Sequence, residues 1–493
     1  EPYRRQRQMC IRDRNMTKPG EKLILSYSDT NAKGEGISPA YLIGSIRSLY
    51  PKLEIENSYC YPENPEAGID LFLEKLVQET EKEHEDILEQ ADETDAMFGE
   101  LYSWYLRNPE YRSRVQKLVQ SAFAGKPKDI ISQSVAKALY GEVSPYSATR
   151  LERFAACAFA HFLQYGMKLT ERVEYEFKPM DMGNVMHEAL ESFAEEVRKR
   201  GMKWTELTEQ ERNEIADRCL DNIVADYGNT VLKSSARNEY MIERTRRILR
   251  RTVWALQKQL EQGEFQPEGF EVTFGGGRID RVDIMEDQNK VYVKVIDYKT
   301  GNTSFDLVYL YHGLQLQLMI YLDGALRVEQ KKYPDKEIIP AGVFYYNIKD
   351  PMIQEKIDAD VEAVSAGLMK ELKMNGLAQA DPELVYRMDS SLGSIPVAFN
   401  KDGSFRKNSS VADRTQFAVL GRYVRTKIEK IRSSILEGDA EVSPYELGKK
   451  NACTYCPYMT VCGFDRRLSG YEFRRLKNFS DEELWKAFDR EAE

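Results

Sequence analysis

The segments GRIDRVD, at residues 277–283, and VIDYKTG, at residues 295–301, decide the fold of this 493-residue chain. From position 291, valines alternate with other residues, which is the two-residue period of a β-strand. On that period Asp297 and Lys299 share the face of the valines. The pattern therefore predicts a strand that carries an acid and a base on its apolar face.

A polar run at residues 286–290 predicts a turn between this strand and the preceding one. If the turn is centred between positions 288 and 289, Asp280 lies directly opposite Asp297. Two opposed carboxylates destabilise a hairpin unless a positive charge lies between them, and a hard divalent cation with oxygen ligands is the usual solution. Lys299 would then orient or help to deprotonate a bound water. The alternative is a solvent-exposed hairpin in which Lys299 neutralises the two acids.

Two helical segments add polar residues that suit such a site. The segment GNVMHEALE at residues 183–191 carries His187 on a helix, where a structural histidine is the usual alternative to a metal ligand. Gln317 and Tyr321 lie one turn apart on a later helix and face the same way. The alternative for this pair is that both residues pack at the edge of the core.

We interpret Gly275–Gly277 as a bulge or a close backbone approach beside the site, rather than as a phosphate cradle.

Together these segments resemble the PD-(D/E)XK nuclease core of RecB-type enzymes. The sequence has a Gly-x-x-x-His-x-x-x-Glu helix, a Gly-x-Ile-Asp strand, Asp-Tyr-Lys-Thr-Gly and a Gln-x-x-x-Tyr helix, in the order of that family. The resemblance implies an α/β fold with helical surroundings and one Mg²⁺ or Mn²⁺ site. The protein ligands of the metal would be His187, Asp280, Asp297 and the backbone carbonyl of Tyr298. Lys299 would position the attacking water, and Gln317 and Tyr321 would position DNA.

A group of cysteines indicates a second metal site. Cys453, Cys456 and Cys462 supply three thiolates within ten positions, which suits zinc, an iron–sulfur cluster or a redox dithiol. No histidine follows at zinc-finger spacing, and Cys157 is the best candidate for a fourth ligand. One distant cysteine with a C-terminal trio resembles the iron–sulfur RecB-family nucleases, which implies a [4Fe–4S] cluster that joins the two ends of the domain. A zinc site with the same ligands remains open.

Residues 144–169, which include LERF and FAHFLQYG, resemble the start of the nuclease domain in the AddB family, whose members are one of the two components of bacterial AddAB helicase–nucleases. Ala158 replaces the proline that is usual in that family. The resemblance covers residues 15–493 and implies an Mg²⁺-dependent exonuclease that cuts the 5′-terminated strand when double-strand breaks are processed for recombinational repair. The implied partners are an AddA-type helicase–nuclease subunit and single-stranded or broken double-stranded DNA. The chain has no recognisable Gly-x-x-x-x-Gly-Lys-Ser/Thr ATP site.

The sequence predicts three parts. Residues 1–14 carry five arginines without periodicity and are treated as a tail, native or not. Residues 15–140 would be the C-terminal remnant of a helicase-like domain. A polar joint at residues 141–147 would open the nuclease domain, which extends from 141 to 493 and is closed by the four cysteines.

Local patterns predict the elements of each part. In the first part, residues 23–27 are expected to form a short buried strand and residues 38–49 a helix with Ser38 as N-cap. The acidic run 81–95 is typical of a solvated helix face. In the second part, we expect helices at 148–165, 236–261 and 311–328, and strands at 270–299 and 341–348.

Charge and hydropathy exclude some classes of protein. The formal net charge of −10 argues against a surface coated with nucleic-acid-binding charge, but it leaves room for a local basic groove. The arginine-rich stretch 237–251 is a candidate for phosphate contact, although such a run is usually a solvated helix face. No apolar run of membrane-spanning length and no signal peptide occur, so we expect no membrane partner and a cytoplasmic location.

Two other functions fit parts of the sequence. A stand-alone exonuclease of the CRISPR-associated or replication type would carry the same cysteines, but such enzymes start near the first cysteine of the cluster. A non-catalytic DNA-binding scaffold with a nuclease fold would not need His187, Asp280, Asp297 and Lys299 together. We therefore expect a deoxyribonuclease.

Overall fold

The structure is a computed structural model. It describes residues 16–27, 38–53, 93–122, 130–170, 179–226, 235–353, 360–467 and 470–492, together with six positions between 65 and 76.

Two units make up the chain, Glu1–Ala122 and Phe123–Glu493. This division lies ahead of the predicted joint at residues 141–147. The reason is that α6 (Gln133–Tyr140) buries Tyr140 in a core of the second unit, so the helix belongs with the elements that follow it.

The first unit has a small core of its own. α4 (Glu93–Arg107) and α5 (Pro109–Ala122) pack against each other, and their core includes Phe72, Tyr105 and Val115.

The predictions for the start of the chain are only partly correct. The strand predicted at 23–27 is wrong: these residues form no strand, and Ile24 is 74% exposed. A strand needs partners for its backbone groups, and none of the strands in the described part pairs with this segment. α2 (Tyr41–Leu49) confirms the neighbouring helix, but it begins later than a Ser38 cap requires. Of the acidic run, residues 81–92 lie outside the described residues.

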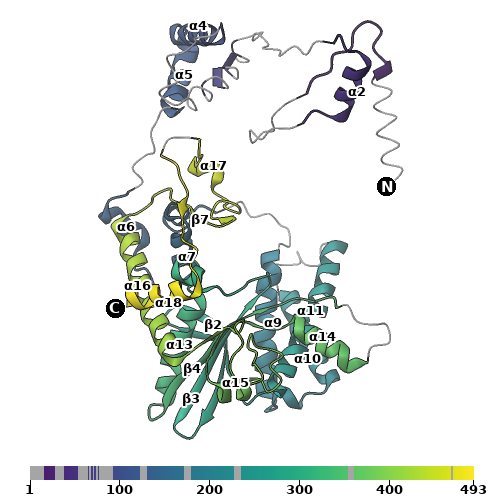
Figure 1. Ribbon diagram of the computed structural model, residues 1–493, viewed down its shortest axis with the longest axis vertical. Helices are drawn as coiled ribbons and strands as arrows, with labels where there is room; N and C mark the ends of the chain where they lie inside the picture. The colour runs from purple at the N-terminus through teal and green to yellow at the C-terminus, as the bar shows by residue number, and fades with distance from the viewer. Residues whose placement is uncertain are drawn as a thin grey trace. The chain divides into compact units, whose positions relative to one another are not determined.

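A six-stranded mixed sheet lies at the centre of the second unit (Figure 1). Its strands lie side by side in chain order: β1 (Gln266–Phe274), β2 (Gly277–Asp287), β3 (Lys290–Lys299), β4 (Glu337–Asn347), β5 (Asn375–Gln379) and β6 (Val411–Ala412). β1, β2 and β3 pair antiparallel, β4 is parallel to β3, β5 is antiparallel to β4, and β6 is parallel to β5. The strands predicted at 270–299 and 341–348 are thus confirmed, with extra residues at their N-terminal ends.

The hairpin of β2 and β3 has the register that the polar turn predicts. Arg281 pairs with Ile296, so the turn is centred between positions 288 and 289. The same register places Asp280 opposite Asp297 at the open end of the hairpin. The valines of β3 have no exposed surface, which confirms that they form a buried face.

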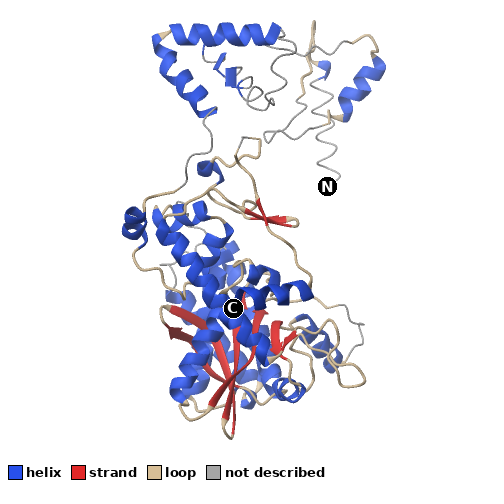
Figure 2. Cartoon of the chain, turned by 60° about the vertical axis from the view of Figure 1, so that its left-hand side comes forward, coloured by secondary structure: helices blue, strands red, loops and turns tan. Residues whose placement is uncertain are grey.

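Helices cover both faces of the sheet, as Figure 2 shows. One face carries α9 (Pro179–Lys199), α10 (Glu209–Asp226) and α11 (Ala236–Glu261), and the other carries α7 (Ala148–Ala156), α13 (Gln317–Lys332) and α16 (Arg414–Glu437). Because side chains alternate along a strand, Val295 packs in one core, whereas Ile296 and Tyr298 pack in the other. This arrangement confirms the predicted α/β fold with helical surroundings.

Two of the predicted helices have different ends in the structure. The helix predicted at 148–165 is interrupted by Cys157, whose φ of −165° is extended, between α7 and α8 (Ala158–His161). A π-helical turn, η2 (Phe162–Gly166), follows. The helix predicted at 311–328 consists instead of α12 (Leu307–Tyr311) and α13, which begins at Gln317. By contrast, α11 has the predicted bounds.

The remaining elements complete the second unit. They are η3 (Trp204–Glu206), α14 (Val361–Glu371), α15 (Pro382–Met388), a small sheet of β7 (Tyr445–Leu447), β8 (Lys450–Asn451) and β9 (Arg474–Arg475), α17 (Met459–Cys462) and α18 (Asp481–Ala492). Among the helices of the described part, none combines the length and the hydropathy of a membrane span.

Candidate metal centre and four-cysteine group

Asp280 is buried near the start of β2, where its side chain reaches the neighbouring strand. Its Oδ2 atom accepts a hydrogen bond from the backbone N–H of Tyr298 at 2.8 Å. Burial and the nearby Asp297 carboxylate raise the pKa of Asp280 to about 7. The hairpin therefore places two carboxylates where each disfavours the ionisation of the other.

Asp297 is buried on β3 and is held by two partners. Its Oδ1 atom accepts a hydrogen bond from Nε2 of Gln317 at 2.8 Å, and its Oδ2 atom lies 2.6 Å from Nζ of Lys299. Nζ of Lys299 also donates to Oε1 of Gln317 at 2.8 Å. Burial raises the pKa of Asp297, although the Lys299 ammonium opposes this effect. The three side chains form a closed ring of contacts.

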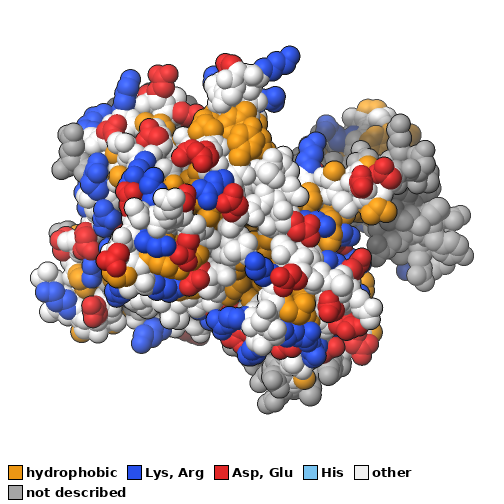
Figure 3. Space-filling model, turned by 90° about the horizontal axis from the view of Figure 1, so that it is seen from below, with side chains coloured by type: hydrophobic (Ala, Val, Ile, Leu, Met, Phe, Trp, Pro, Cys, Tyr) orange, Lys and Arg blue, Asp and Glu red, His pale blue; other side chains and the backbone are white. Residues whose placement is uncertain are grey.

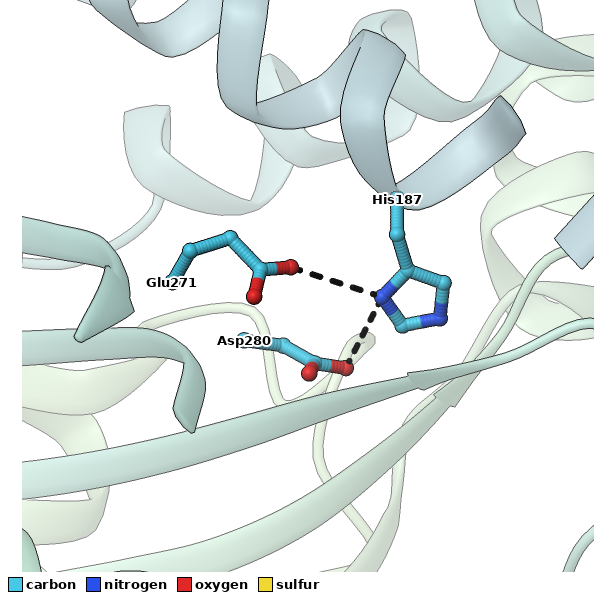
Figure 4. Close-up of side chains that lie close together, drawn as sticks. All are labelled: His187, Glu271 and Asp280. Carbon is cyan, nitrogen blue, oxygen red and sulfur yellow. Dashed lines mark ion pairs between the residues drawn. The ribbon is translucent and has the colours of Figure 1, made fainter. Parts of the chain in front are cut away.

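His187 reaches the site from α9. The neighbouring residues Met186, Leu190 and Phe193 are buried against the sheet, and they fix this face of the helix. Nδ1 of His187 lies 3.3 Å from Oδ2 of Asp280 (Figure 4). Burial lowers the pKa of His187, but the surrounding carboxylates outweigh burial and raise it.

Glu271 also belongs to the site, and the sequence predictions missed it. Its Oε1 atom lies 3.7 Å from Nδ1 of His187 (Figure 4), and its Oε2 atom lies 2.5 Å from Nε of Arg278. Its side chain is only 6% exposed, and its φ of 50° is unusual for a residue with a side chain. Because β1 and β2 pair Phe270 with Arg281, the register places Glu271 opposite Asp280.

A signal for Glu271 was present in the glycines. Gly275 and Gly276 have φ values of 49° and 92° and form the turn between β1 and β2, as is typical of a tight hairpin. A turn centred between them places residue 271 opposite residue 280 by the argument that paired Asp280 with Asp297. The interpretation of these glycines as a bulge is therefore wrong. The predicted close approach is confirmed, since a Cβ at Gly275 would clash with the ring of Tyr146.

The open end of the sheet thus carries three carboxylates in one row, on β1, β2 and β3. Among the His, Cys, Asp and Glu side chains of the described part, one group of three has ligand atoms close enough together to hold a single metal ion. It consists of His187, Glu271 and Asp280, whose ligand atoms lie within 4.8 Å of one another. Asp297 adjoins this group as the carboxylate opposite Asp280.

Tyr321 completes the contacts of Gln317. Nε2 of Gln317 lies 2.8 Å from the hydroxyl of Tyr321, one turn later on α13. The structure therefore places both residues of the Gln-x-x-x-Tyr segment beside Asp297 and Lys299. Gln317 contacts the acid and the base directly, which distinguishes it from an ordinary core-edge residue. Tyr321 contacts Gln317 and packs at the edge of the core.

The four cysteines line one small cavity, although Cys157 is far from the other three in sequence. Cys157 is buried at the break after α7, whereas Cys453, Cys456 and Cys462 are partly exposed. The Cys456 sulfur lies 3.9 Å from Nη2 of Arg153. Burial and the neighbouring thiols raise the pKa of Cys453 to about 12. The residues that line this cavity include the four cysteines and no Asp or Glu.

The arginine-rich helix α11 uses much of its charge within the protein. Arg246 and Arg250 pair with Asp217 on α10, and Arg247 pairs with Asp350 at 2.5 Å. On the face shown in Figure 3, basic side chains are interspersed with acidic ones. These ion pairs favour the interpretation of α11 as an ion-paired helix surface.

Comparisons with known proteins agree with this geometry. The PD-(D/E)XK nuclease superfamily matches residues 145–463. A protein of Lachnoclostridium phytofermentans is 39% identical over 97% of this chain, and proteins of Alkaliphilus metalliredigens and Clostridium acetobutylicum are 32% and 31% identical over the same share. All three are described as a subunit of an ATP-dependent helicase/deoxyribonuclease. The matched region is 43% of each relative, so this chain spans less than half of their length.

Proposed function

This chain belongs to the PD-(D/E)XK nuclease superfamily, and from that premise we propose that it hydrolyses DNA phosphodiester bonds with a divalent cation. The observation that carries the proposal is the row of Glu271, Asp280 and Asp297 on three adjacent strands. An isolated row of this kind is costly because like charges repel across a sheet. A cation between the carboxylates turns that repulsion into binding energy.

The donor set fits Mg²⁺ or Mn²⁺, which prefer oxygen ligands. Asp280, Asp297 and His187 would hold the ion together with the backbone carbonyl of Tyr298. A strand residue directs its N–H and its C=O toward the same neighbouring strand. Because the N–H of Tyr298 donates to Asp280, its carbonyl also faces β2. Glu271 supplies a further carboxylate beside His187. The ion would contribute charge neutralisation to an in-line displacement at phosphorus.

Lys299 is the residue that would position the attacking water. Its ammonium group is held between Asp297 and Gln317, and these two contacts fix the position of the charge. Its side chain remains 28% exposed, so the group is accessible from solvent. A positive charge fixed in this way can orient a water and stabilise negative charge on a phosphate. Gln317 and Tyr321 would position DNA beside it.

We further propose that the four cysteines hold one [4Fe–4S] cluster. Support comes from the all-thiol donor set around one cavity and from the resemblance to iron–sulfur nucleases of the RecB type. Cys157 precedes the catalytic strands in the chain, and the trio follows them. A cluster shared by all four would join the two ends of the domain around its catalytic core.

The names of the relatives suggest a wider context. They describe one subunit of a helicase/deoxyribonuclease, so we propose that this chain acts with an AddA-type subunit on single-stranded and broken double-stranded DNA. Cleavage of the 5′-terminated strand in recombinational repair follows from the resemblance to the AddB family. Residues 15–122 would then be the remnant of the helicase-like domain.

The proposed chemistry can be tested with a matched pair of variants. Asp297→Asn should abolish Mg²⁺-dependent cleavage of end-labelled single-stranded DNA, because it removes a charged ligand at the site. Asp323→Asn makes the same change on the outer face of α13, where Asp323 pairs with Arg425, and should cleave normally. Cleavage by Asp297→Asn at the wild-type rate would overturn the assignment. Tight DNA binding by the wild-type chain without any cleavage would favour the scaffold.

A further inference from the structure

The helix that carries Gln317 begins without a cap of its own. The residue before α13 is Leu316, whose side chain cannot accept a hydrogen bond. The first N–H groups of a helix need acceptors, and here the acceptor comes from another element. Oε1 of Glu152, on α7, accepts the backbone N–H groups of Leu316 and Gln317 at 2.7 and 2.9 Å.

The charge of Glu152 makes this cap unusual. Burial raises the pKa of Glu152 to about 7, although the two backbone hydrogen bonds and the nearby Lys299 lower it. The nearby Asp297 carboxylate also disfavours a second negative charge. The positive end of α13 compensates in part, because a helix N-terminus stabilises a carboxylate. A neutral Ser or Thr at the cap position 316 would avoid the repulsion between the two carboxylates. The use of an acid from another helix as the cap therefore needs a functional explanation.

The contacts of Gln317 supply that explanation. Gln317 is the first residue of α13, and its amide bonds to both Asp297 and Lys299. A shift of the first turn of α13 would therefore move the amide that orients the acid and the base. Glu152 holds that turn by two hydrogen bonds to its backbone.

Other contacts hold α7 in place. Arg153, the next residue after Glu152, lies close to the Cys456 sulfur, and Cys157 directly follows the last residue of α7. The backbone carbonyl of Ala155 accepts a hydrogen bond from Arg474 near the C-terminus. One helix thus contacts the cysteine group at its end and α13 at its middle.

We propose that Glu152 is a positioning residue of the nuclease site, which acts by holding the first turn of α13 and, through it, the Gln317 amide on Asp297 and Lys299. The inference rests on the proposed nuclease function. It predicts that Glu152 affects the rate of cleavage more than the affinity for DNA, because its hydrogen bonds go to the backbone at the start of α13 and not to DNA-facing side chains or metal ligands.

The test compares Glu152→Ala, Glu152→Gln and Asp381→Ala in the full chain. Asp381 caps α15 by accepting two backbone N–H groups, those of Glu383 and Leu384, so it is a matched cap outside the site. Glu152→Ala should lower kcat by roughly 100-fold with little change in KM, since small misplacements cost that much. Glu152→Gln keeps an acceptor oxygen and should recover most of the rate. Asp381→Ala should lower the Tm but leave kcat unchanged.

Two further measurements separate positioning from a merely structural cap. In a double-mutant cycle, Glu152→Ala should add little to the loss caused by Gln317→Ala, because both act through one group. In amide hydrogen exchange without metal or DNA, Glu152→Ala should lose protection at the first turn of α13. Additive losses, or a lower Tm with normal kcat in Glu152→Ala, would overturn the proposal.

The exchange measurement does not depend on cleavage. If Asp297→Asn still cleaves DNA, the proposed function fails, whereas unchanged exchange at Leu316 and Gln317 rejects the role of Glu152 by itself.

Discussion

Glu271 lies opposite Asp280 on neighbouring antiparallel strands, and both carboxylates point toward Nδ1 of His187, at 3.7 and 3.3 Å. This relationship gives the site one more acid than the sequence motifs predict. Of the two acids, Glu271 also has an arginine partner, Arg278, which is itself largely exposed. Because solvent screens the charge of an exposed arginine, the Glu271 carboxylate should remain available to a bound cation.

We expect Glu271→Gln to weaken Mn²⁺ binding by roughly 10- to 100-fold, which is the usual cost of removing a group that supports a metal ligand. The change removes a charge while keeping the size of the side chain. Isothermal titration of the metal into the protein measures the effect without any turnover. Glu268→Gln, on the same strand but paired with Lys332 at the surface, should bind Mn²⁺ normally. Equal affinities in the two variants would remove Glu271 from the site.

Lys299→Ala should separate metal binding from cleavage. The ammonium group contacts Asp297 and Gln317, and its loss removes the charge that orients the attacking water. Single-turnover cleavage should fall by roughly 100-fold or more, whereas Mn²⁺ binding should be retained. Lys290→Ala, at the other end of β3, serves as the control. A variant that cut DNA as fast as the wild type would show that Lys299 only neutralises the acids.

Cys157→Ala should remove the metal of the cysteine group, although Cys157 is remote from the trio in sequence. We expect the anaerobically purified protein to be brown, with broad absorbance near roughly 400 nm from thiolate-to-iron charge transfer. The variant should be colourless and should have a lower Tm. Cys219→Ala, at a buried cysteine on α10, should keep both colour and iron. Colourless wild-type protein with one zinc per chain would reject the cluster but keep the grouping.

His161 should make the fold sensitive to mild acid. Its ring is fully buried, and Nε2 accepts a hydrogen bond from Arg150 at 3.3 Å. Burial, together with Arg150 and Arg153, lowers the pKa of His161 from 6.5 to about 3. Below pH 6.5 the unfolded chain therefore binds a proton at this histidine, whereas the ring stays neutral in the folded chain. The contribution of the neutral ring to the free energy of unfolding is fully present above pH 6.5. It decreases as the pH falls toward 3, by about 1.4 kcal/mol per pH unit.

The measurement is urea unfolding of the wild type and of His161→Gln at pH 7.5 and 5.5. Gln keeps an acceptor for Arg150 but does not titrate, so the free energy of unfolding of the variant should fall less between the two pH values. The other titratable groups contribute equally in both proteins. If both proteins lost the same free energy of unfolding between the two pH values, His161 would not control the acid response.

The sequence alone determined the features of the site that depend on neighbouring residues. The register of β2 and β3 follows from a turn between positions 288 and 289, and strand periodicity then puts Asp297 and Lys299 on one face. Such features are predictable because a hairpin turn sets its own register and side chains alternate along every strand. The bounds of α11 follow for a similar reason, since caps and apolar spacing are local.

Only the tertiary structure decided the contacts between distant elements. The cap of α13 by Glu152, the extended backbone at Cys157 and the exposure of residues 23–27 depend on how elements pack, and no local pattern encodes them. Glu271 is intermediate, because its glycine turn is local but its approach to His187 requires α9 to lie over β1. Turn geometry acts within a few residues, whereas helix packing on a sheet joins residues that are remote from one another in the chain.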